Sequence, residues 1–301
     1  MKKLLLLISL LLCLAHPGLA AEIVVLKSSD IAPYAQVAAG FEKEFQLQMP
    51  ALGLKAIAPH RFHEVVLDNQ EGRKKLQALV DSSHADLILA LGKKALGTAR
   101  QFTETPVVYT LVVHPDKLTA GSTHITGINL TIPPALQFSE VKRILPQVQR
   151  VGVLYNPEHS EDLISQAEKV LSGYQLHAVP IHSAQELPAL LDSLRDKIDL
   201  LWMIPDLTTT NRKTLPSYFH FSFKNKIPVL TFSQRYLKPG AALATSFDLE
   251  AIGQSAAEQA SLILRGRPVA EVPVQQVPRL KTKVNQTIMK KLNLSIAGGG
   301  Q

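Results

Sequence analysis

Residues 86–92 read Asp-Leu-Ile-Leu-Ala-Leu-Gly, a short apolar run that ends in a glycine. A run of about four to eight apolar residues bounded by turn-forming residues is typical of a strand buried on both faces of a parallel sheet. We therefore expect a strand at Asp86–Ala90 and, after Gly92, a loop and a helix that continues to Arg100. A strand buried on both faces needs helices on either side of its sheet, so this run predicts an α/β fold.

The same alternation of apolar runs and helical patterns extends in both directions along the chain. Residues Ile23–Leu26 predict the first strand, and residues 34–47 predict a helix because Val37, Phe41 and Phe45 recur at helical spacing. The other elements expected before residue 131 are a less regular strand near Leu52–Ala58, a helix over 73–82, a strand over 106–110 and a short strand over 125–130. Repeated strand–helix units of this kind indicate a parallel sheet.

Residues 121–134 break this rhythm with glycines, hydroxyl-bearing residues and two prolines, which marks a passage between domains. After them the alternation restarts, which predicts a second α/β half. Its expected helices cover 135–145, 160–172, 184–195 and 208–223, and its expected strands cover 151–155, 176–180, 198–204 and 228–231.

The tail of the chain does not continue this alternation. It carries a strand-like stretch over 241–246, a long Ala-rich helix over 248–264, an extended segment over 272–277 and a last helix over 285–292. Because a long helix and more extended chain follow the second half, we expect the backbone to return to the first lobe. The predicted lobes are therefore discontinuous: lobe 1 comprises 21–128 with about 247–277, and lobe 2 comprises 129–246 with about 278–301.

The first 20 residues have the pattern of a cleavable signal peptide. Lys2 and Lys3 precede an apolar run that is too short to span a membrane, and small residues precede Ala21. A lipid anchor would need a small residue before the cysteine, whereas Leu12 precedes Cys13. Removal of this segment would leave a chain without cysteine, which suits an oxidising compartment. The sequence therefore predicts a soluble protein of the periplasm.

The charge of the chain is positive but dispersed. It has 32 Lys and Arg residues against 25 Asp and Glu, a formal charge of +7 at pH 7, and 46% of its residues are hydrophobic, which excludes disorder. The basic residues form short pairs such as Lys74-Lys75 and Lys290-Lys291 without interleaved aromatic residues. We therefore expect a solvated basic surface and no nucleic acid or membrane as a partner.

Motifs of enzymes and metal sites are incomplete. The nearest string to a serine-hydrolase motif, Gly253–Ala257, lacks the second glycine, and Gly92–Thr98 has a threonine where a P-loop requires lysine. His60 and His63 would share one face of a helix, but no second cluster follows at ligand spacing, and surface histidines are the simpler interpretation. We expect no catalytic residue, no metal, no cofactor and no enzymatic activity.

Polar side chains follow the expected strands of both halves. In open α/β sheets, ligands bind at the carboxyl ends of the strands, where loop amides and helix N-termini collect. Short polar groups at these positions can satisfy a small polar ligand. The predicted ligand-binding residues are Ser28, Ser29, Asp30, Gly92, Lys93, Thr110, Asn129, Tyr155, Asn156, Asp206, Thr208, Ser233 and Asp248.

Several of these residues have structural alternatives. Ser29, Asp30 and Thr208 could cap helices, as could Ser160. Asp206 and Asp248 each follow an apolar stretch and could pair with a ligand ammonium, or form a salt bridge between the lobes. Tyr34, Phe41 and Trp202 are interpreted mainly as core or rim residues.

Seven further segments are best considered together. They are Ala85–Gly92, Pro106–Tyr109, Ile125–Ile128, Pro146–Pro157, Lys226–Val229, Asp248–Gly266, and Asn285 with Leu292–Leu294. Their order and spacing resemble the bacterial ABC-transporter substrate-binding protein family that includes tryptophan- and tyrosine-binding members. The resemblance implies a type I periplasmic-binding fold, in which two doubly wound parallel-sheet lobes are joined by a three-segment hinge and hold a ligand between them.

The chain departs from the family pattern at two places. His114-Pro115 stands where many members carry an acidic residue before proline, and Gly92-Lys93-Lys94 replaces a more threonine-rich loop. Aromatic amino acids are the family's best-known ligands, while Lys93 could favour an anionic group. The resemblance implies a monomeric periplasmic protein that captures a small polar or aromatic, amino-acid-like ligand for an ABC permease. A ligand-sensing protein that regulates a membrane receptor or sensor kinase is the alternative, and a secreted α/β enzyme is a third.

Overall fold

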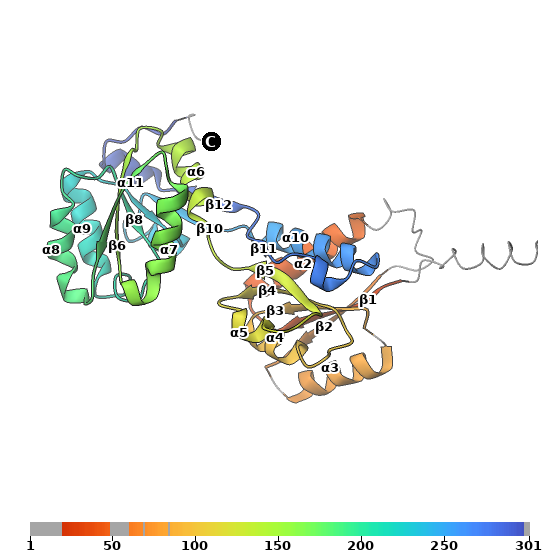
Figure 1. Cartoon of the computed structure of the whole chain (residues 1–301). Coiled ribbons are helices and arrows are strands. Elements are labelled where there is room, and N and C mark those ends of the chain that lie inside the picture. Colours follow the sequence, from red (N-terminus) through yellow and green to blue (C-terminus); the bar gives the residue numbers. More distant parts are fainter. Residues whose placement is uncertain (1–19, 49–59, 69, 84, 298–301) are drawn as a thin grey trace, which may run out of the picture. The chain divides into compact units, whose positions relative to one another are not determined.

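A computed structural model of the chain describes residues 20–48, 60–68, 70–83 and 85–297 (Figure 1). The expected signal peptide, up to residue 19, and the strand expected near Leu52–Ala58 lie outside these residues. The chain forms two compact units: unit 1 comprises Met1–Thr131 and Leu249–Pro278, and unit 2 comprises Ile132–Asp248 and Arg279–Gln301. The chain therefore passes between the units three times.

Unit 1 contains a six-stranded sheet in the order β11-β5-β4-β3-β1-β2, in which every pairing is parallel. Helices cover both faces of this sheet, with α2 and α10 on one side and α3, α4 and α5 on the other (Figure 1). Its strands are β1 (Glu22–Lys27), β2 (Arg61–Val66), β3 (Leu87–Leu91), β4 (Val107–Val112), β5 (Ile125–Asn129) and β11 (Gln275–Gln276). Its helices are α2 (Ala32–Gln48), α3 (Gln70–Ser83), α4 (Lys93–Ala99), α5 (Asp116–Thr119), α10 (Leu249–Leu264) and the 3-10 turn η4 (Val269–Glu271).

Unit 2 contains a second six-stranded sheet in the order β12-β10-β9-β8-β6-β7, parallel except for β12. Its strands are β6 (Arg150–Tyr155), β7 (Gln175–Pro180), β8 (Leu200–Met203), β9 (Val229–Thr231), β10 (Leu243–Phe247) and β12 (Leu280–Val284). Its helices are α6 (Pro134–Ile144), α7 (Pro157–Val170), α8 (Leu187–Ser193), α9 (Leu215–Asn225) and α11 (Gln286–Lys291), with 3-10 turns η2 (Ala184–Glu186) and η3 (Gln234–Tyr236).

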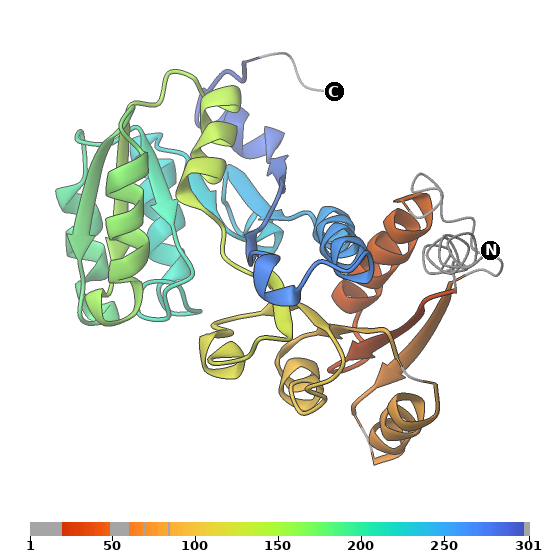
Figure 2. The same ribbon diagram turned by 45° about the vertical axis from the view of Figure 1, so that its right-hand side comes forward.

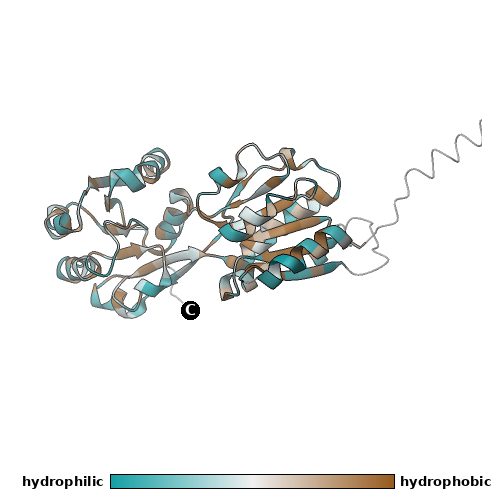
Figure 3. Cartoon of the chain, turned by 90° about the horizontal axis from the view of Figure 1, so that it is seen from below, coloured by the Kyte–Doolittle hydropathy of each residue, from teal (hydrophilic) through white to brown (hydrophobic). Residues whose placement is uncertain are grey.

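The two sheets have the same strand order when strands are counted along each unit: second, first, third, fourth, fifth, sixth. The predicted α/β class with two doubly wound, mainly parallel sheets is thus confirmed. The strand predicted at Asp86–Ala90 is β3, and all five of its residues are fully buried. In Figure 3 the strands inside each unit are mainly hydrophobic, whereas hydrophilic residues gather on the helices.

The structure differs from the sequence-based expectations at three places. The stretch around His63 forms strand β2 rather than a helix, so its histidine spacing does not produce a shared helix face. The helix predicted from residue 208 begins at Leu215, because hydrogen-bonded turns occupy residues 206–214. Strand β12 was not predicted, since its sequence Leu-Lys-Thr-Lys-Val alternates between apolar and basic side chains at an edge of the sheet.

The return of the chain to unit 1 depends on close packing between α2 and α10. The two helices lie side by side in both views of the ribbon (Figure 2). A Cβ atom at Gly253 would lie 2.3 Å from the carbonyl oxygen of Val37 and 2.7 Å from the amide nitrogen of Phe41. A Cβ atom at Gly40 would lie 2.6 Å from the carbonyl oxygen of Glu250. Only glycine permits backbones to approach so closely.

The core of unit 2 has one hydrophobic cluster on each face of the sheet. On one face α6, α7 and α11 pack around Phe138 and Trp202, whose rings meet edge to face at 5.2 Å between centroids. On the other face α8 and α9 pack around Leu191, Tyr218 and Phe221. Trp202 is therefore a core residue, as predicted, and its indole Nε1 donates to Oε1 of the buried Gln137 at 2.9 Å.

A helix that crosses a membrane must be both long and apolar. None of the helices within residues 20–48, 60–68, 70–83 and 85–297 meets both conditions.

We predict that Gly253→Ala lowers the free energy of unfolding by about 3 kcal/mol, because the added methyl group meets backbone atoms that cannot rotate away. Gly97→Ala is the matched control: Gly97 is also helical, but nothing lies within 4 Å of the place that its added methyl group would occupy. We expect that control to be unchanged or more stable by about 1 kcal/mol. Thermal unfolding followed by circular dichroism measures both, and equal melting temperatures for Gly253→Ala and the unmodified chain would contradict the packing described here.

Candidate functional site

Each sheet has one point where the order of the strands reverses. In unit 1 this switch point lies between β1 and β3, and in unit 2 it lies between β6 and β8. Loops that leave neighbouring strands in opposite directions open a crevice at such a point, which is where open α/β sheets bind ligands. The residues that follow these four strands are therefore the first candidates for a site in each unit.

At the switch point of unit 1, Ser28 follows β1 and Gly92 follows β3. The Oγ atom of Ser28 accepts a hydrogen bond from the amide of Ala95 at 2.9 Å, and the amide of Ser28 donates to the carbonyl of Leu91 at 3.0 Å. Ser28 therefore caps the first turn of α4 from a neighbouring strand. Its hydroxyl has a structural role, and a contact with ligand stays a prediction.

Tyr34 lies against the same turn. A Cβ atom at Gly92 would lie 2.2 Å from the phenol oxygen of Tyr34 and 2.8 Å from Oγ of Ser28. Gly92 also has a φ of 89°, in the region that favours glycine. Glycine is thus required at this position for two independent reasons, and it allows a partly exposed tyrosine to reach the start of α4.

The carboxyl end of β4 has unusual backbone geometry. Leu111 and His114 have φ values of 57° and 51°, which bulky residues rarely adopt, and the pairing with β5 shifts register between Tyr109 and Val112. The neighbouring Thr110 is fully buried, and its Oγ1 has no hydrogen-bond partner among the described residues. Strained backbone of this kind concentrates at ligand sites.

The other polar residues at this edge differ in their hydrogen bonds and in their exposure. Tyr109 donates from its phenol oxygen to Oδ1 of Asn129 at 2.8 Å. Burial, with a smaller effect from Asp116, raises the pKa of Tyr109 to about 12, so the phenol keeps the proton that it donates. Lys93 at the start of α4 and Asp30 after β1 are exposed, and Ser29 is half-buried. Lys93 and Asp30 are therefore accessible charges at this edge.

At the switch point of unit 2, Asp206 organises the loop after β8. Its Oδ2 atom accepts hydrogen bonds from the amide of Asn156 at 2.8 Å and from Oγ of Ser160 at 2.7 Å. Its Oδ1 atom accepts from the amides of Thr208 at 2.8 Å and Thr209 at 3.2 Å. With four donors on a carboxylate that is 1% exposed, Asp206 orders this loop, and a contact with ligand stays a prediction.

Asn156 connects the two loops at this switch point. Its side-chain oxygen accepts from the amide of Glu158 at 3.0 Å and so caps α7, while its side-chain nitrogen donates to Oγ1 of Thr208 at 2.9 Å. The helix cap is therefore Asn156. Ser160 and Thr208, for which a capping role was the alternative, do not cap a helix, because Ser160 lies inside α7 and Thr208 lies in a turn before α9.

Asp248 lies between β10 and α10, where the chain leaves unit 2. Its carboxylate pairs with Nε of Arg279 and with Nζ of Lys281, each at 3.2 Å, and both partners belong to unit 2, as Asp248 does.

Two further candidates of unit 2 lie at other strand ends. Tyr155 ends β6, and burial together with the neighbouring Glu161 raises its pKa. Ser233 precedes η3. Both are half-buried and remain accessible from solvent.

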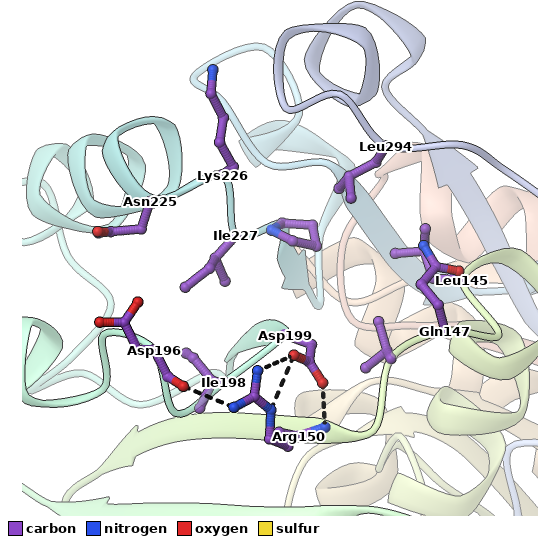
Figure 4. A pocket seen from close by; sticks show the side chains of 12 residues that line it. Leu145, Gln147, Arg150, Asp196, Ile198, Asp199, Asn225, Lys226, Ile227 and Leu294 are labelled. Carbon is purple, nitrogen blue, oxygen red and sulfur yellow. Dashed lines mark hydrogen bonds and ion pairs between the residues drawn. The ribbon is translucent and has the colours of Figure 1, made fainter.

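A depression of about 470 Å³ lies at the opposite edge of unit 2, where β6, β8 and β9 begin (Figure 4). Arg150 lies in it and donates to Oδ1 of Asp199 from Nη2 at 2.6 Å and to the carbonyl of Asp196 from Nη1 at 2.7 Å. Burial raises the pKa of Asp199, but hydrogen bonds from Arg150 and backbone amides outweigh it, and the net pKa lies below its ordinary value. These polar groups satisfy one another, so this edge is not the candidate site.

The two histidines whose spacing could suit a metal have other partners. Nε2 of His63 lies 2.7 Å from Oε2 of Glu22, and Nδ1 of His60 accepts from the amide of Ala21 at 2.9 Å. They thus connect β1 to the start of β2. Within the described part of the chain, no group of three or more His, Cys, Asp or Glu residues is arranged to hold a metal ion.

The family model for ABC transporter substrate-binding proteins matches residues 53–298. The chain belongs to this family. The tyrosine-binding protein of Clostridioides difficile (strain R20291) is 25% identical over 228 residues, which cover 71% of this chain and 64% of that protein. The matched region is therefore less than two thirds of the relative's length.

Solved structures show the same fold for this substrate-binding family member. A ligand-free, open substrate-binding protein with adhesive properties from Clostridium difficile superposes with a TM-score of 0.70 at 20% identity, covering 93% of this chain and 97% of that one. A complex with L-Trp from Streptococcus pneumoniae gives 0.52 at 18% identity, covering 93% and 96%. Two α/β units with these strand orders are the type I periplasmic-binding-protein fold, as predicted.

The predicted ligand-binding residues all come from carboxyl strand ends, and two of their neighbours are not among them. Tyr34, whose sequence context favours a core or rim residue, lies against the start of α4. Leu207 is the apolar residue between Asp206 and Thr208 and is 82% exposed. A large apolar residue within a polar loop was the signal that could have identified it.

We predict that Asp206→Ala lowers the free energy of unfolding of this substrate-binding protein by about 3 kcal/mol or more. The variant removes four hydrogen bonds to a charged acceptor and leaves the buried Ser160 hydroxyl unpaired. Ser160→Ala, which removes one of the four, is expected to cost about 1 kcal/mol. Urea denaturation measures both variants, and a cost for Asp206→Ala no larger than that for Ser160→Ala would contradict the organising role of Asp206.

Proposed function

We propose that this protein is a periplasmic solute-binding protein that captures a small amino-acid-like ligand with an aromatic or polar side chain. Polar groups at carboxyl strand ends hold the ligand, which is delivered to an ABC permease without chemical change. The protein is exported by a cleavable signal peptide and acts as a monomer without cofactor. Membership of the substrate-binding family and the two equivalent switch points support this proposal.

The accessible charges in unit 1 suit the two charged groups of a free amino acid. Lys93 is exposed at the start of α4, where its ammonium can pair with a carboxylate. Asp30 is exposed after β1 and can pair with an ammonium group. Tyr34, at the same switch point, offers a ring and a hydroxyl. These groups match an amino acid better than a neutral sugar.

Two of the compared proteins carry names that agree with this class of ligand. One is a tyrosine-binding protein, and another was solved in complex with L-Trp. Their identities to this chain are 25% and 18%, so the ligand is proposed from the side chains at the strand ends together with these names.

We predict that L-tyrosine, L-tryptophan or L-phenylalanine raises the melting temperature of the purified chain, whereas L-arabinose and D-ribose do not. At a ligand concentration of about 100 times Kd, binding stabilises the folded state by about 2.7 kcal/mol. Differential scanning fluorimetry over this panel identifies the ligand, and isothermal titration calorimetry then gives Kd. A shift caused by the sugars alone would contradict the proposal.

Lys93→Ala tests the position of the carboxylate in the same assay. We expect this variant to weaken binding of the identified amino acid about 10-fold, because a charge-assisted hydrogen bond is lost. Lys74→Ala is the control, since Lys74 is equally exposed but lies on α3. Equal Kd values for the two variants would remove Lys93 from the site.

A further inference from the structure

The loop after β8 is fixed along most of its length. Asp206 holds the amides of Thr208 and Thr209, and its carbonyl accepts from the amide of Thr210 at 2.7 Å. The hydroxyl of Thr210 donates to the carbonyl of Ile204 at 2.9 Å. The side chain of Asn211 donates to the carbonyl of Leu207 at 3.1 Å. This loop is therefore a rigid element even though it contains neither helix nor strand.

Leu207 is the exception to the burial of this loop. Leu207 is 82% exposed, whereas Ile204 and Asp206 are 1% exposed and Thr209 is fully buried. The surrounding hydrogen bonds fix the backbone on both sides of Leu207 and leave its side chain in solvent. Because the backbone of this loop is already ordered, binding a partner against Leu207 does not add the entropic cost of ordering the loop.

The position of Leu207 indicates what covers it. Leu207 directly precedes Thr208, whose hydroxyl accepts from the side chain of Asn156 at the switch point of unit 2, where sheets of this topology bind small ligands. In unit 1, two more exposed apolar side chains, Ile31 at 45% and Val113 at 57%, also follow strands at the carboxyl edge. The polar candidates at these edges are thus accompanied by apolar groups that a purely polar ligand would not need.

We propose that Leu207 is a specificity-determining residue that packs against the apolar side chain of the bound ligand. This inference rests on the proposed function and deepens it: the ligand has a bulky apolar or aromatic side chain as well as its charged groups. The Leu207 side chain is buried only when the ligand is bound, so its removal weakens the complex without affecting the free protein. The expected consequence is a loss of affinity of about 10-fold or more.

The experiment measures Kd for L-tyrosine and L-tryptophan by calorimetry with the full chain and with substitutions at Leu207. Leu207→Ser removes the apolar surface, and Leu207→Met retains it with a different shape. Leu47→Ser and Val170→Ser are matched controls, because these residues are 64% and 45% exposed but lie at the ends of α2 and α7, away from the carboxyl edges of the sheets. Melting temperatures without ligand show whether each variant folds as the unmodified chain does.

We expect Leu207→Ser to weaken binding about 10-fold or more, Leu207→Met to stay within about 3-fold, and both controls to stay within about 2-fold. All variants should melt within about 2 °C of the unmodified chain without ligand, since exposed side chains contribute little to stability. An unchanged Kd for Leu207→Ser would overturn this inference while leaving the proposed function in place, and would favour a protein partner as the group that covers Leu207. If the unmodified chain binds neither amino acid, the proposed function fails and the inference fails with it.

Discussion

The packing of α10 against α2 is the constraint on which the rest of the structure depends. α10 follows the last parallel strand of unit 2, yet it belongs to unit 1, where Gly253 and Gly40 bring the two helix backbones into contact. Because no side chain separates the helices there, α10 has a single position against α2. The chain must then supply β11 to the sheet of unit 1 and cross once more to supply β12 to unit 2. One helix contact thus explains why neither unit is a continuous piece of chain.

The equivalent strand orders have a direct consequence for chemistry. Each sheet reverses its order once, so each unit has one place where neighbouring loops diverge. At both places hydrogen-bonded polar groups hold the loops in shape: Ser28 caps α4, and Asp206 accepts four hydrogen bonds. The more accessible groups, among them Lys93 and Leu207, are the ones that the proposed ligand would contact. Ser28 and Asp206 therefore belong to the framework of their loops.

The sequence predicts the fold well because buried parallel strands have continuous apolar runs, such as the run that forms β3. It predicts β12 poorly, because an edge strand with alternating lysines looks like solvated chain. It also places the start of α9 too early, because the hydroxyl side chains of residues 208–210 suit a capped helix and hydrogen-bonded turns equally well. The positions of the candidate residues at strand ends follow from topology. Their roles do not, since the cap that Ser28 provides depends on Ala95, 67 residues away.

The central claim is that the carboxyl edge of each sheet, at its switch point, is where ligand binds. Hydrogen-exchange mass spectrometry of the full chain, with and without a saturating amino acid from the binding panel, tests it most directly. The account predicts slower exchange in residues 28–34 of unit 1 and in residues 204–211 of unit 2, with no change in residues 145–150 at the opposite edge. Protection at residues 145–150 instead, or no protection at either switch point, would contradict the account.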